Sequence, residues 1–418
     1  MSSTPSDGSV GAAPPAVPAR RRGRLLRMVV LGALTAAAPL SLDTYLPALP
    51  SLAADLRSSP STAQLSLTSC LVGLAVGQLV AGPLSDVLGR RRPMIVGALG
   101  FALASTACAF APSVEVLIGL RLAQGLLGAV GIVLARAVVR DTSDATSSAR
   151  AFASQMLVSG VAPIVAPVLG GQLLRVTSWR GVFVFLAAFG ALVLMALLRA
   201  VPESLPPDRR RAGGAAETLA SFRLLLADRR VLACVLAAGL VFSAMFAYIS
   251  GSTFVLQDLY GLSPQGFSAV FAANSVGIVA SVQTAGRLAG AGKVRPVRLL
   301  AVGLAVALTG TAALLVAVLA GAGLPGIVAG LFVTVCGVGL VLPSATTLAL
   351  ADHPDHAGSA SALLGTAQFI VGAGVAPLVG LAGSSSAVPM AATMAGAVLL
   401  GAVTFTVIWR SAASRVAA

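Results

Sequence analysis

Two charged residues, Asp43 and Arg121, lie inside long apolar stretches of the sequence. If these stretches are helices with a rise of about 1.5 Å per residue, both side chains lie roughly 10 Å below the same surface. Burial favours the neutral form of a carboxylic acid, whereas a nearby guanidinium favours the carboxylate. We therefore expect Asp43 to take up and release a proton as its surroundings change, with Arg121 as the partner of the deprotonated form.

Two simpler interpretations of this pair stay open. Asp43 and Arg121 can form a fixed structural salt bridge, or Asp43 can lie close enough to the surface to stay hydrated. In neither case would the pair carry protons across a membrane.

The composition is typical of a polytopic membrane protein. Of the 418 residues 57% are hydrophobic and only 10% are charged, which leaves too little polar surface to cover a water-soluble globule. Apolar runs of about 20 residues predict twelve transmembrane helices and an all-α integral membrane fold. The predicted helices are residues 25–49, 62–87, 93–111, 114–140, 149–175, 179–199, 230–256, 264–290, 297–320, 325–350, 356–382 and 387–410.

The chain divides into two halves of six helices each. The segment Ser148–Gln155 returns as Ser361–Gln368, and Val161–Pro163 returns as Val375–Pro377. Two parallel six-helix repeats are typical of one class of secondary transporters. The predicted regions are a disordered basic tail (1–24), a first bundle (25–199), a polar linker (200–229), a second bundle (230–410) and a short tail (411–418).

Basic residues predict the orientation in the membrane. All but four of the 28 Lys and Arg residues fall in the loops and tails of one side, which the positive-inside rule assigns to the cytoplasm. The exceptions are Arg57, Arg121, Arg175 and Arg180. An even number of helices places both termini on that side. The net charge of +14 therefore orients the chain against the lipid bilayer, and we expect no nucleic-acid partner.

Three motifs resemble those of the major facilitator superfamily. Gly82–Arg91 resembles the motif G-x-L-[SA]-D-x-x-G-R-R between helices 2 and 3, with every fixed position filled. Arg121–Gly125 with Gly128 resembles the helix 4 motif of proton-coupled antiporters. Ala162–Gly171 resembles the helix 5 antiporter motif, although Ala166 departs from it. The resemblance covers Leu25–Arg410 and implies that family's fold of two six-helix repeats.

Other segments resemble the bicyclomycin-resistance-like (Bcr/CflA) branch of the drug:proton antiporters with 12 spans. They are Leu42–Pro50, Ile249–Gln257, Tyr260–Gln265 and Ala357–Gly365. This resemblance implies a monomer in the bacterial cytoplasmic membrane that exports small amphiphilic drugs, such as phenicols, bicyclomycin or sulfonamides, in exchange for protons by alternating access. It implies no cofactor.

The resemblance also suggests conformational residues. In the motif between helices 2 and 3, Asp86 is expected to join a charge network that stabilises one closed state, unless it merely makes the turn soluble. The motif positions are Gly82, Asp86, Gly89, Arg90 and Arg91. In helix 5, proline and glycine residues are expected to break the helix and form a hinge that seals the path against ion leak. These are Pro163, Pro167, Gly170 and Gly171.

A drug-binding cavity is less clearly marked in the sequence. Apolar walls with a few polar groups suit amphiphilic drugs, although each candidate can equally be a core residue. The candidates are Tyr45, Gln124, Phe246, Tyr248, Phe254, Gln257 and Gln368.

Other functional classes find little support. The chain has no nucleotide-binding G-x-x-x-x-G-K-[ST] loop and no Ser-His or Cys-His set, so we expect neither ATP drive nor an enzyme. The four cysteines lie in apolar runs, and His353 and His356 lie in a proline-interrupted turn, so we expect no metal site. Two alternatives stay open: an exporter of an endogenous metabolite or self-made antibiotic, and a non-transporting membrane sensor or scaffold.

Overall fold

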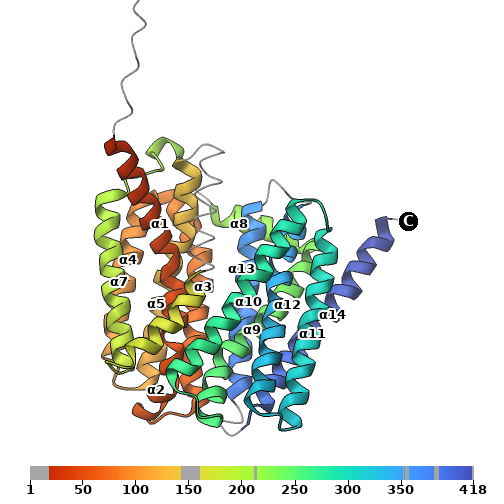
Figure 1. Cartoon of the computed structure of the whole chain (residues 1–418). Helices are drawn as coiled ribbons and strands as arrows, with labels where there is room; N and C mark the ends of the chain where they lie inside the picture. The colour runs from red at the N-terminus through yellow and green to blue at the C-terminus, as the bar shows by residue number, and fades with distance from the viewer. Residues whose placement is uncertain are drawn as a thin grey trace, which may run out of the picture.

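The computed structural model describes residues 18–142, 161–210, 214–351, 353, 357–380 and 386–416. Across these residues every regular element is a helix. The long helices stand side by side in two groups, one from each half of the chain (Figure 1). The predicted all-α architecture is confirmed.

The first group contains six spans. They are α1 (Pro18–Asp43), which continues through the short helices η1 (Leu46–Ala48) and α2 (Leu49–Asp55); α3 (Pro60–Leu88); α4 (Arg91–Ala109); α5 (Val114–Thr142); a helix at Val161–Leu173; and α7 (Trp179–Ala200). A connecting segment with η2 (Pro207–Arg209) and α8 (Gly214–Ala227) leads to the second group.

In the described residues the second group, like the first, contains five helices long enough to span a membrane and one with a shorter apolar segment. They are α9 (Arg229–Phe254), which continues through the π-helical turn η3 (Val255–Leu259); α10 (Pro264–Gly290); α11 (Pro296–Leu319); α12 (Gly323–Ala351); α13 (Ala357–Gly380); and α14 (Val388–Val416).

Helix length and hydropathy in the described residues agree with the predicted spans. Ten helices are long and apolar enough to cross a membrane, and two shorter apolar segments lie at the fifth and eleventh predicted positions. These two are Val161–Leu173 and Ser359–Val375. Most boundaries fall within a few residues of the prediction because Gly, Pro and Arg clusters mark the turns.

Four features differ from the sequence-based expectation. α1 begins at Pro18, inside the predicted tail 1–24, and α14 continues to Val416, beyond the predicted end at 410. The first predicted helix, 25–49, is interrupted after Asp43, because Pro47 has no N–H to donate to the Asp43 carbonyl four residues earlier. The linker 200–229 contains the helix α8. The repeat segment Ser148–Gln155 lies outside the described residues.

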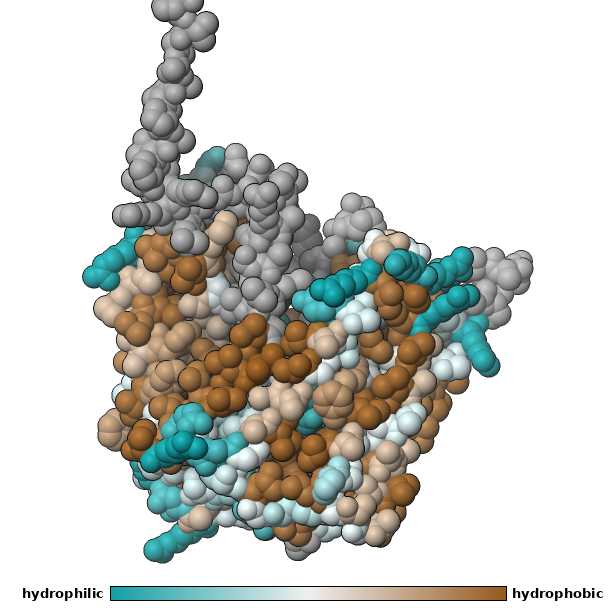
Figure 2. All heavy atoms as spheres, viewed as in Figure 1, coloured by the Kyte–Doolittle hydropathy of each residue, from teal (hydrophilic) through white to brown (hydrophobic). Residues whose placement is uncertain are grey.

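The outer surface is apolar. Figure 2 shows a broad hydrophobic surface across the middle of the molecule, with hydrophilic residues gathered toward its two ends. Large exposed side chains such as Val96 and Leu103 of α4, Leu192 of α7 and Val316 of α11 contribute to such a surface. A bilayer solvates these side chains, so the chain is a multi-pass membrane protein.

Two ends of the molecule are distinguished below. The basic end is the one at which α3 turns into α4 through Gly89–Arg92; the opposite end is the one at which α4 turns into α5. Between the two groups, α3 packs against α13, and the Val161–Leu173 helix forms hydrogen bonds with α10. These four helices therefore form much of the interface between the halves.

Candidate functional site

Arg121 is fully buried on α5. Its Nη1 donates to the Ser41 carbonyl oxygen at 3.0 Å and to Gln124 Oε1 at 2.5 Å. The guanidinium carbon lies 4.8 Å from the centre of the Tyr45 ring and 5.7 Å from that of Phe183, so cation–π attraction replaces part of its hydration. Its Nε and Nη2 atoms have no hydrogen-bond partner among the residues that the structure describes. A buried cation with free donors is poised to take an anionic or polar partner.

Asp43 ends α1 and is 7% exposed. Arg121 reaches the carbonyl of Ser41, two residues earlier, yet no ion pair joins Arg121 to Asp43, and Asp43 has none with any other described residue. Asp43 lies instead within electrostatic range of Tyr248 of the second group. The two predicted charges are thus both buried, but this conformation does not bring them together.

The cavity candidates of the first group surround Arg121. The Tyr45 hydroxyl hydrogen-bonds to the Ser66 hydroxyl, and the Tyr45 ring packs on Phe183 with centroids 5.3 Å apart. The Gln124 amide nitrogen donates to Ser105 Oγ at 2.7 Å, which orients its oxygen toward Arg121. The aromatic and amide groups therefore hold the guanidinium in one position.

The candidates of the second group are mostly buried as well. Tyr248 accepts a hydrogen bond from Asn274 Nδ2 at 3.0 Å, and its ring stacks on Phe271 at 5.3 Å. Phe246 and Phe254 lie in the same apolar core as Tyr45 and Tyr248, and Gln368 of α13 is half-buried. In this conformation protein side chains from both groups fill the centre of the molecule.

Hydrogen bonds between the two groups close the opposite end. Ser268 Oγ of α10 lies 2.7 Å from the Pro167 carbonyl oxygen and 2.7 Å from that of Pro264 in its own helix. Ser275 Oγ lies 3.1 Å from the Pro163 carbonyl oxygen and 2.9 Å from that of Phe271, so each hydroxyl proton can be donated across the interface or within α10. Donation by Ser275 across the interface satisfies a carbonyl that lacks a helical partner, because Pro167 has no N–H to donate four residues back. A further bond joins Gln265 Nε2 to the Gly171 carbonyl at 2.7 Å.

Gly170 allows the same helix to approach α1. A β-carbon at Gly170 would lie 1.9 Å from the Thr44 carbonyl oxygen, which excludes every other residue type. Two more bridges lie nearby: Gln64 Nε2 donates to the Ser250 carbonyl at 3.1 Å, and Gln257 Nε2 to the Pro47 carbonyl at 3.2 Å. The helix 5 residues and Gln257 thus lie in an interface between the halves.

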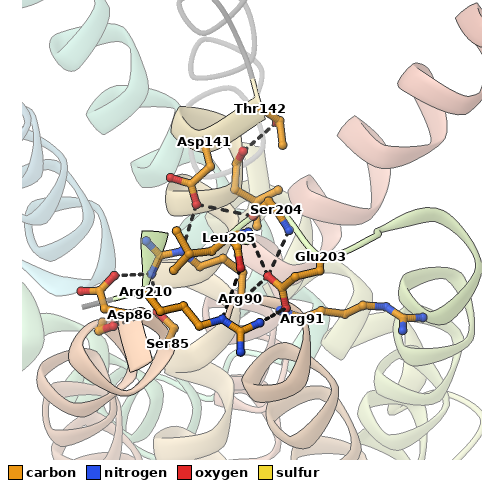
Figure 3. A network of polar contacts seen from close by, with 12 residues as sticks. Ser85, Asp86, Arg90, Arg91, Asp141, Thr142, Glu203, Ser204, Leu205 and Arg210 are labelled. Atoms are coloured by element: carbon orange, nitrogen blue, oxygen red, sulfur yellow. Dashed lines mark hydrogen bonds and ion pairs between the residues drawn. The ribbon is translucent and has the colours of Figure 1, made fainter. Parts of the chain in front are cut away.

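At the basic end, Arg90 is the centre of a charge network (Figure 3). Arg90 is only 4% exposed; its Nη1 lies 2.6 Å from Asp86 Oδ1, and its Nε donates to Asp141 Oδ2 at 3.0 Å. Arg91 donates through Nε to the Val201 carbonyl and through Nη2 to the Leu198 carbonyl, both at 3.0 Å. The network ties the α3–α4 turn to the ends of α5 and α7.

Glu203 caps the start of α4. Its carboxylate accepts hydrogen bonds from the backbone N–H groups of Arg90 at 2.8 Å and Arg91 at 3.2 Å, where the helix dipole favours an anion. Partial burial raises the pKa of Glu203, but hydrogen bonds from the amides of Leu205, Arg90, Arg91 and Ser204 outweigh it and lower the pKa. Gly89 permits this contact, because it has a φ of 86° and a β-carbon there would lie 2.6 Å from Glu203 Oε2.

A cavity of about 480 Å³ lies between the two groups at the basic end. Gly82, Asp86, Arg136 and Arg140 line it from α3 and α5, and α8 and α13 complete the wall. None of the seven predicted cavity residues lies in this lining. The described residues thus leave a cavity between the halves at the basic end, and hydrogen bonds join the halves toward the opposite end.

His353 belongs to a separate ion pair. Its Nε2 lies 2.9 Å from Asp228 Oδ2, and Asp228 Oδ1 accepts a bond from the Arg230 amide at the start of α9. Burial raises the pKa of Asp228, but the bonds from His353 and Arg230 outweigh it and lower the pKa. His356, the other histidine of the predicted turn, lies outside the described residues.

Sequence reasoning missed several residues of these networks: Glu203, Asp141, Ser268, Ser275 and Asn274. Ser268 and Ser275 are seven residues apart, two helical turns, and therefore share one face of an apolar helix. That spacing could have been used to predict the two serines from the sequence. Glu203 and Asp141 carry no such signal, because their roles depend on tertiary contacts.

Comparison with known proteins identifies the family. The Major Facilitator Superfamily model matches residues 31–377. The chain is 38% identical over 384 residues to the uncharacterized MFS-type transporter YdgK of Bacillus subtilis, covering 91% of this chain and 95% of that protein. It is 28% identical to the bicyclomycin resistance protein homolog of Haemophilus influenzae, covering 92% and 96%.

A solved structure shows the same fold. A bacterial homologue of the human lysosomal transporter Spinster, in an inward-facing and unoccupied conformation, superimposes with a TM-score of 0.74 at 16% identity, covering 96% of this chain and 98% of that one. Together with the family match and the transmembrane architecture, this similarity shows that the chain belongs to the Major Facilitator Superfamily and is a membrane transporter rather than an enzyme.

Proposed function

We propose that the protein is a secondary active multidrug efflux transporter, which exports small amphiphilic drugs in exchange for protons by alternating access. The observation that carries this proposal is the buried Arg121, whose Nε and Nη2 lack partners, together with the buried Asp43 near the interface between the halves. A transporter that exchanges cargo for protons needs buried groups whose partners change between its two states.

In the proposed orientation the basic end faces the cytoplasm of a bacterium. The positive-inside rule favours this side for Arg90, Arg91, Arg92 and the connecting segment, and both termini then lie in the cytoplasm. The cavity between the halves is the cytoplasmic opening, and the bonds of Ser268 and Ser275 seal the outer side.

Proton coupling is assigned to Asp43 and Arg121. When the outer end opens, separation of the halves exposes Asp43 to external protons. In the conformation described above Asp43 is buried and forms no ion pair with Arg121, so release of the proton to the inside requires a rearrangement that brings Arg121 to the carboxylate. Arg121 stabilises the deprotonated form by turning its free Nε and Nη2 toward the carboxylate or a polar group of the drug. In this proposal Asp43 is either protonated or paired with Arg121. Arg121 in turn binds either the Asp43 carboxylate or a polar group of the drug.

The network at the basic end is assigned to the closing step. Asp86 lines the cavity with a side chain that is 40% exposed, and residues of the first turns of α13, Ser359 and Ser361, line it too. Closing this cavity brings the Asp86 carboxylate toward the N-terminus of α13, which favours an anion. Arg90, which is itself paired with Asp141, holds Asp86 in position meanwhile.

The proposal that the cargo is a drug is supported by the relative in Haemophilus influenzae. That protein is named a bicyclomycin resistance protein homolog. The test is a growth-inhibition panel in an efflux-deficient bacterium with phenicols, bicyclomycin, sulfonamides, tetracycline and cationic dyes. Expression of the wild type is expected to raise resistance to some of these compounds, and an equally expressed Asp43→Asn variant is expected to lose it. Resistance to none of the compounds would contradict the proposal and favour a dedicated metabolite exporter.

A further inference from the structure

We infer that the cavity at the basic end holds a binding site for the anionic group of an amphiphilic cargo, formed by Arg136 and Arg140. This inference rests on the proposed efflux function and adds to it the charge class of the substrate. Both residues are exposed on α5 and both line the cavity of about 480 Å³. Cavities of this size suit drug-sized molecules.

Arg136 and Arg140 are four residues apart, so their side chains project from the same face of α5. Neither forms a hydrogen bond or an ion pair with any described residue. Two adjacent guanidinium groups therefore present their N–H donors to the cavity. Guanidinium groups bind carboxylates and phosphates through paired, charge-assisted hydrogen bonds.

The other charges of the cavity are already paired. Arg90 is held by Asp86 and by Asp141, which lies beside the lining. Counting these three groups with Arg136 and Arg140 gives three positive and two negative charges, a net +1. The low-dielectric walls of a cavity strengthen the field of such an excess. The cavity is thus expected to favour anions and to disfavour lipophilic cations.

The rest of the lining suits the apolar body of the same molecule. Phe222 of α8 and Leu79 of α3 provide apolar contacts, and Gln78, Ser359 and Ser361 provide uncharged polar groups. The cavity lies between the two halves and not on the apolar outer surface. This position favours a transported solute over a phospholipid headgroup as the source of the anionic group.

The test is a fluorescence titration of the purified full-length protein in phosphatidylcholine nanodiscs. Three probes share one dansyl body: dansylglycine (carboxylate), dansylglycinamide (neutral) and a dansyl quaternary ammonium (cation). The wild type is expected to bind the carboxylate about tenfold more tightly than the amide, the effect of one charge-assisted hydrogen bond. The cation is expected to bind most weakly.

Variants assign the preference to the two arginines. The double variant Arg136→Gln/Arg140→Gln is expected to lose the carboxylate preference while binding of the amide stays within about twofold. Arg136→Lys/Arg140→Lys is expected to keep a reduced preference. Arg298→Gln, which removes an exposed charge from α11 at the same end, is expected to change nothing.

Three results would overturn the inference. These are a carboxylate preference that survives the double Gln variant, an equal loss of all three probes in that variant, and binding of none of the probes by the wild type. Competition by phosphatidylglycerol added to the nanodiscs would assign the arginines to a lipid headgroup and overturn it as well. Because the titration needs no proton gradient, failure of drug export would contradict the proposed function without altering this result.

Discussion

At the scale of single residues, Arg121 explains why a charge can stay in the interior of this molecule. One of its nitrogens is bound by Ser41 and Gln124, and two aromatic rings face its guanidinium, yet Nε and Nη2 remain free. Arg121 therefore has enough contacts to be tolerated in the interior, and it keeps free donors that can bind a further partner. The planar geometry of the guanidinium, and not its charge alone, allows Arg121 to make these contacts in the interior.

Replacing Arg121 with lysine is expected to abolish most transport. A lysine ammonium keeps the charge but cannot reproduce the planar contact with Tyr45 and the bonds to Ser41 and Gln124 at once. Drug uptake into everted vesicles should fall by tenfold or more, about 1.4 kcal/mol or more. Arg180→Lys is the control: Arg180 also contacts an aromatic ring, but it is 39% exposed at the opposite end and pairs with Asp55. Unchanged uptake with Arg121→Lys would show that charge suffices.

Replacing Glu203 with glutamine is expected to lower the thermal stability of the purified protein. The loss of the charged cap at α4 should cost about 0.5–2 kcal/mol. Because the pKa of Glu203 is lowered in the folded state, its stabilisation is present at neutral pH and disappears as the pH falls through the lowered pKa. The difference in melting temperature should therefore shrink in acid. Asp208→Asn, an exposed acid in the same connecting segment, should show no such difference.

At the scale of helices, the Val161–Leu173 helix and α10 form the seal at the opposite end. The helix is continuous from Val161 to Leu173, without the predicted break at its prolines and glycines, and Pro167 leaves the Pro163 carbonyl available for Ser275 of α10. A bond between separate helices can break when the halves part, whereas a bond within a helix cannot. The serines of α10 thus stabilise one state of the transporter over the other.

The double variant Ser268→Ala/Ser275→Ala is expected to populate the state that is open at the opposite end. Each interhelical hydrogen bond in a membrane contributes about 0.6 kcal/mol, so the population should rise roughly three- to tenfold. Spin labels at the exposed positions Val176 and Leu319, in a background without native cysteines, would report a longer distance between the halves. Thr309→Ala, which removes a bond within α11, is the matched control. An unchanged distance distribution would contradict a sealing role.

The sequence predicts the helices better than their interruptions. Twelve spans follow from apolar length and from turn residues, because the bilayer imposes both. The break after Asp43 is visible in principle from Pro47, but a proline inside a membrane helix often only bends it. α8 escapes prediction because a short helix beside a polar linker has no apolar run of membrane length. The burial of Arg121 is predictable; its partners are not, since they come from α1 and from tertiary packing.

At the scale of the whole molecule, charge and hydropathy are arranged along one axis. The apolar surface of Figure 2 lies between two hydrophilic ends, and the network of Figure 3 lies at the basic one. The halves separate at that end around the cavity and meet at the other through the hydrogen bonds of α10. This arrangement agrees with the proposed mechanism, in which the molecule opens on one side at a time.

The proposed orientation predicts which positions are reached from outside an intact cell. Single cysteines are introduced at Val176, which is 84% exposed near the opposite end, and at Arg223, which is exposed on α8 near the basic end. A membrane-impermeant maleimide should label the cysteine at position 176 in intact cells and the one at position 223 only after permeabilisation. The reverse pattern would place the basic end outside.

The most direct test of proton-coupled export uses proteoliposomes. They are loaded with one drug of the panel, chosen because the wild type confers resistance to it. An imposed pH gradient should drive transport of the drug against its concentration gradient by the wild type, with protons moving in the other direction. The Asp43→Asn variant should bind the drug but show no movement driven by the pH gradient. Gradient-driven transport at the wild-type rate by Asp43→Asn would contradict the assignment of the proton to Asp43, and wild-type transport that ignores the gradient would contradict proton exchange itself.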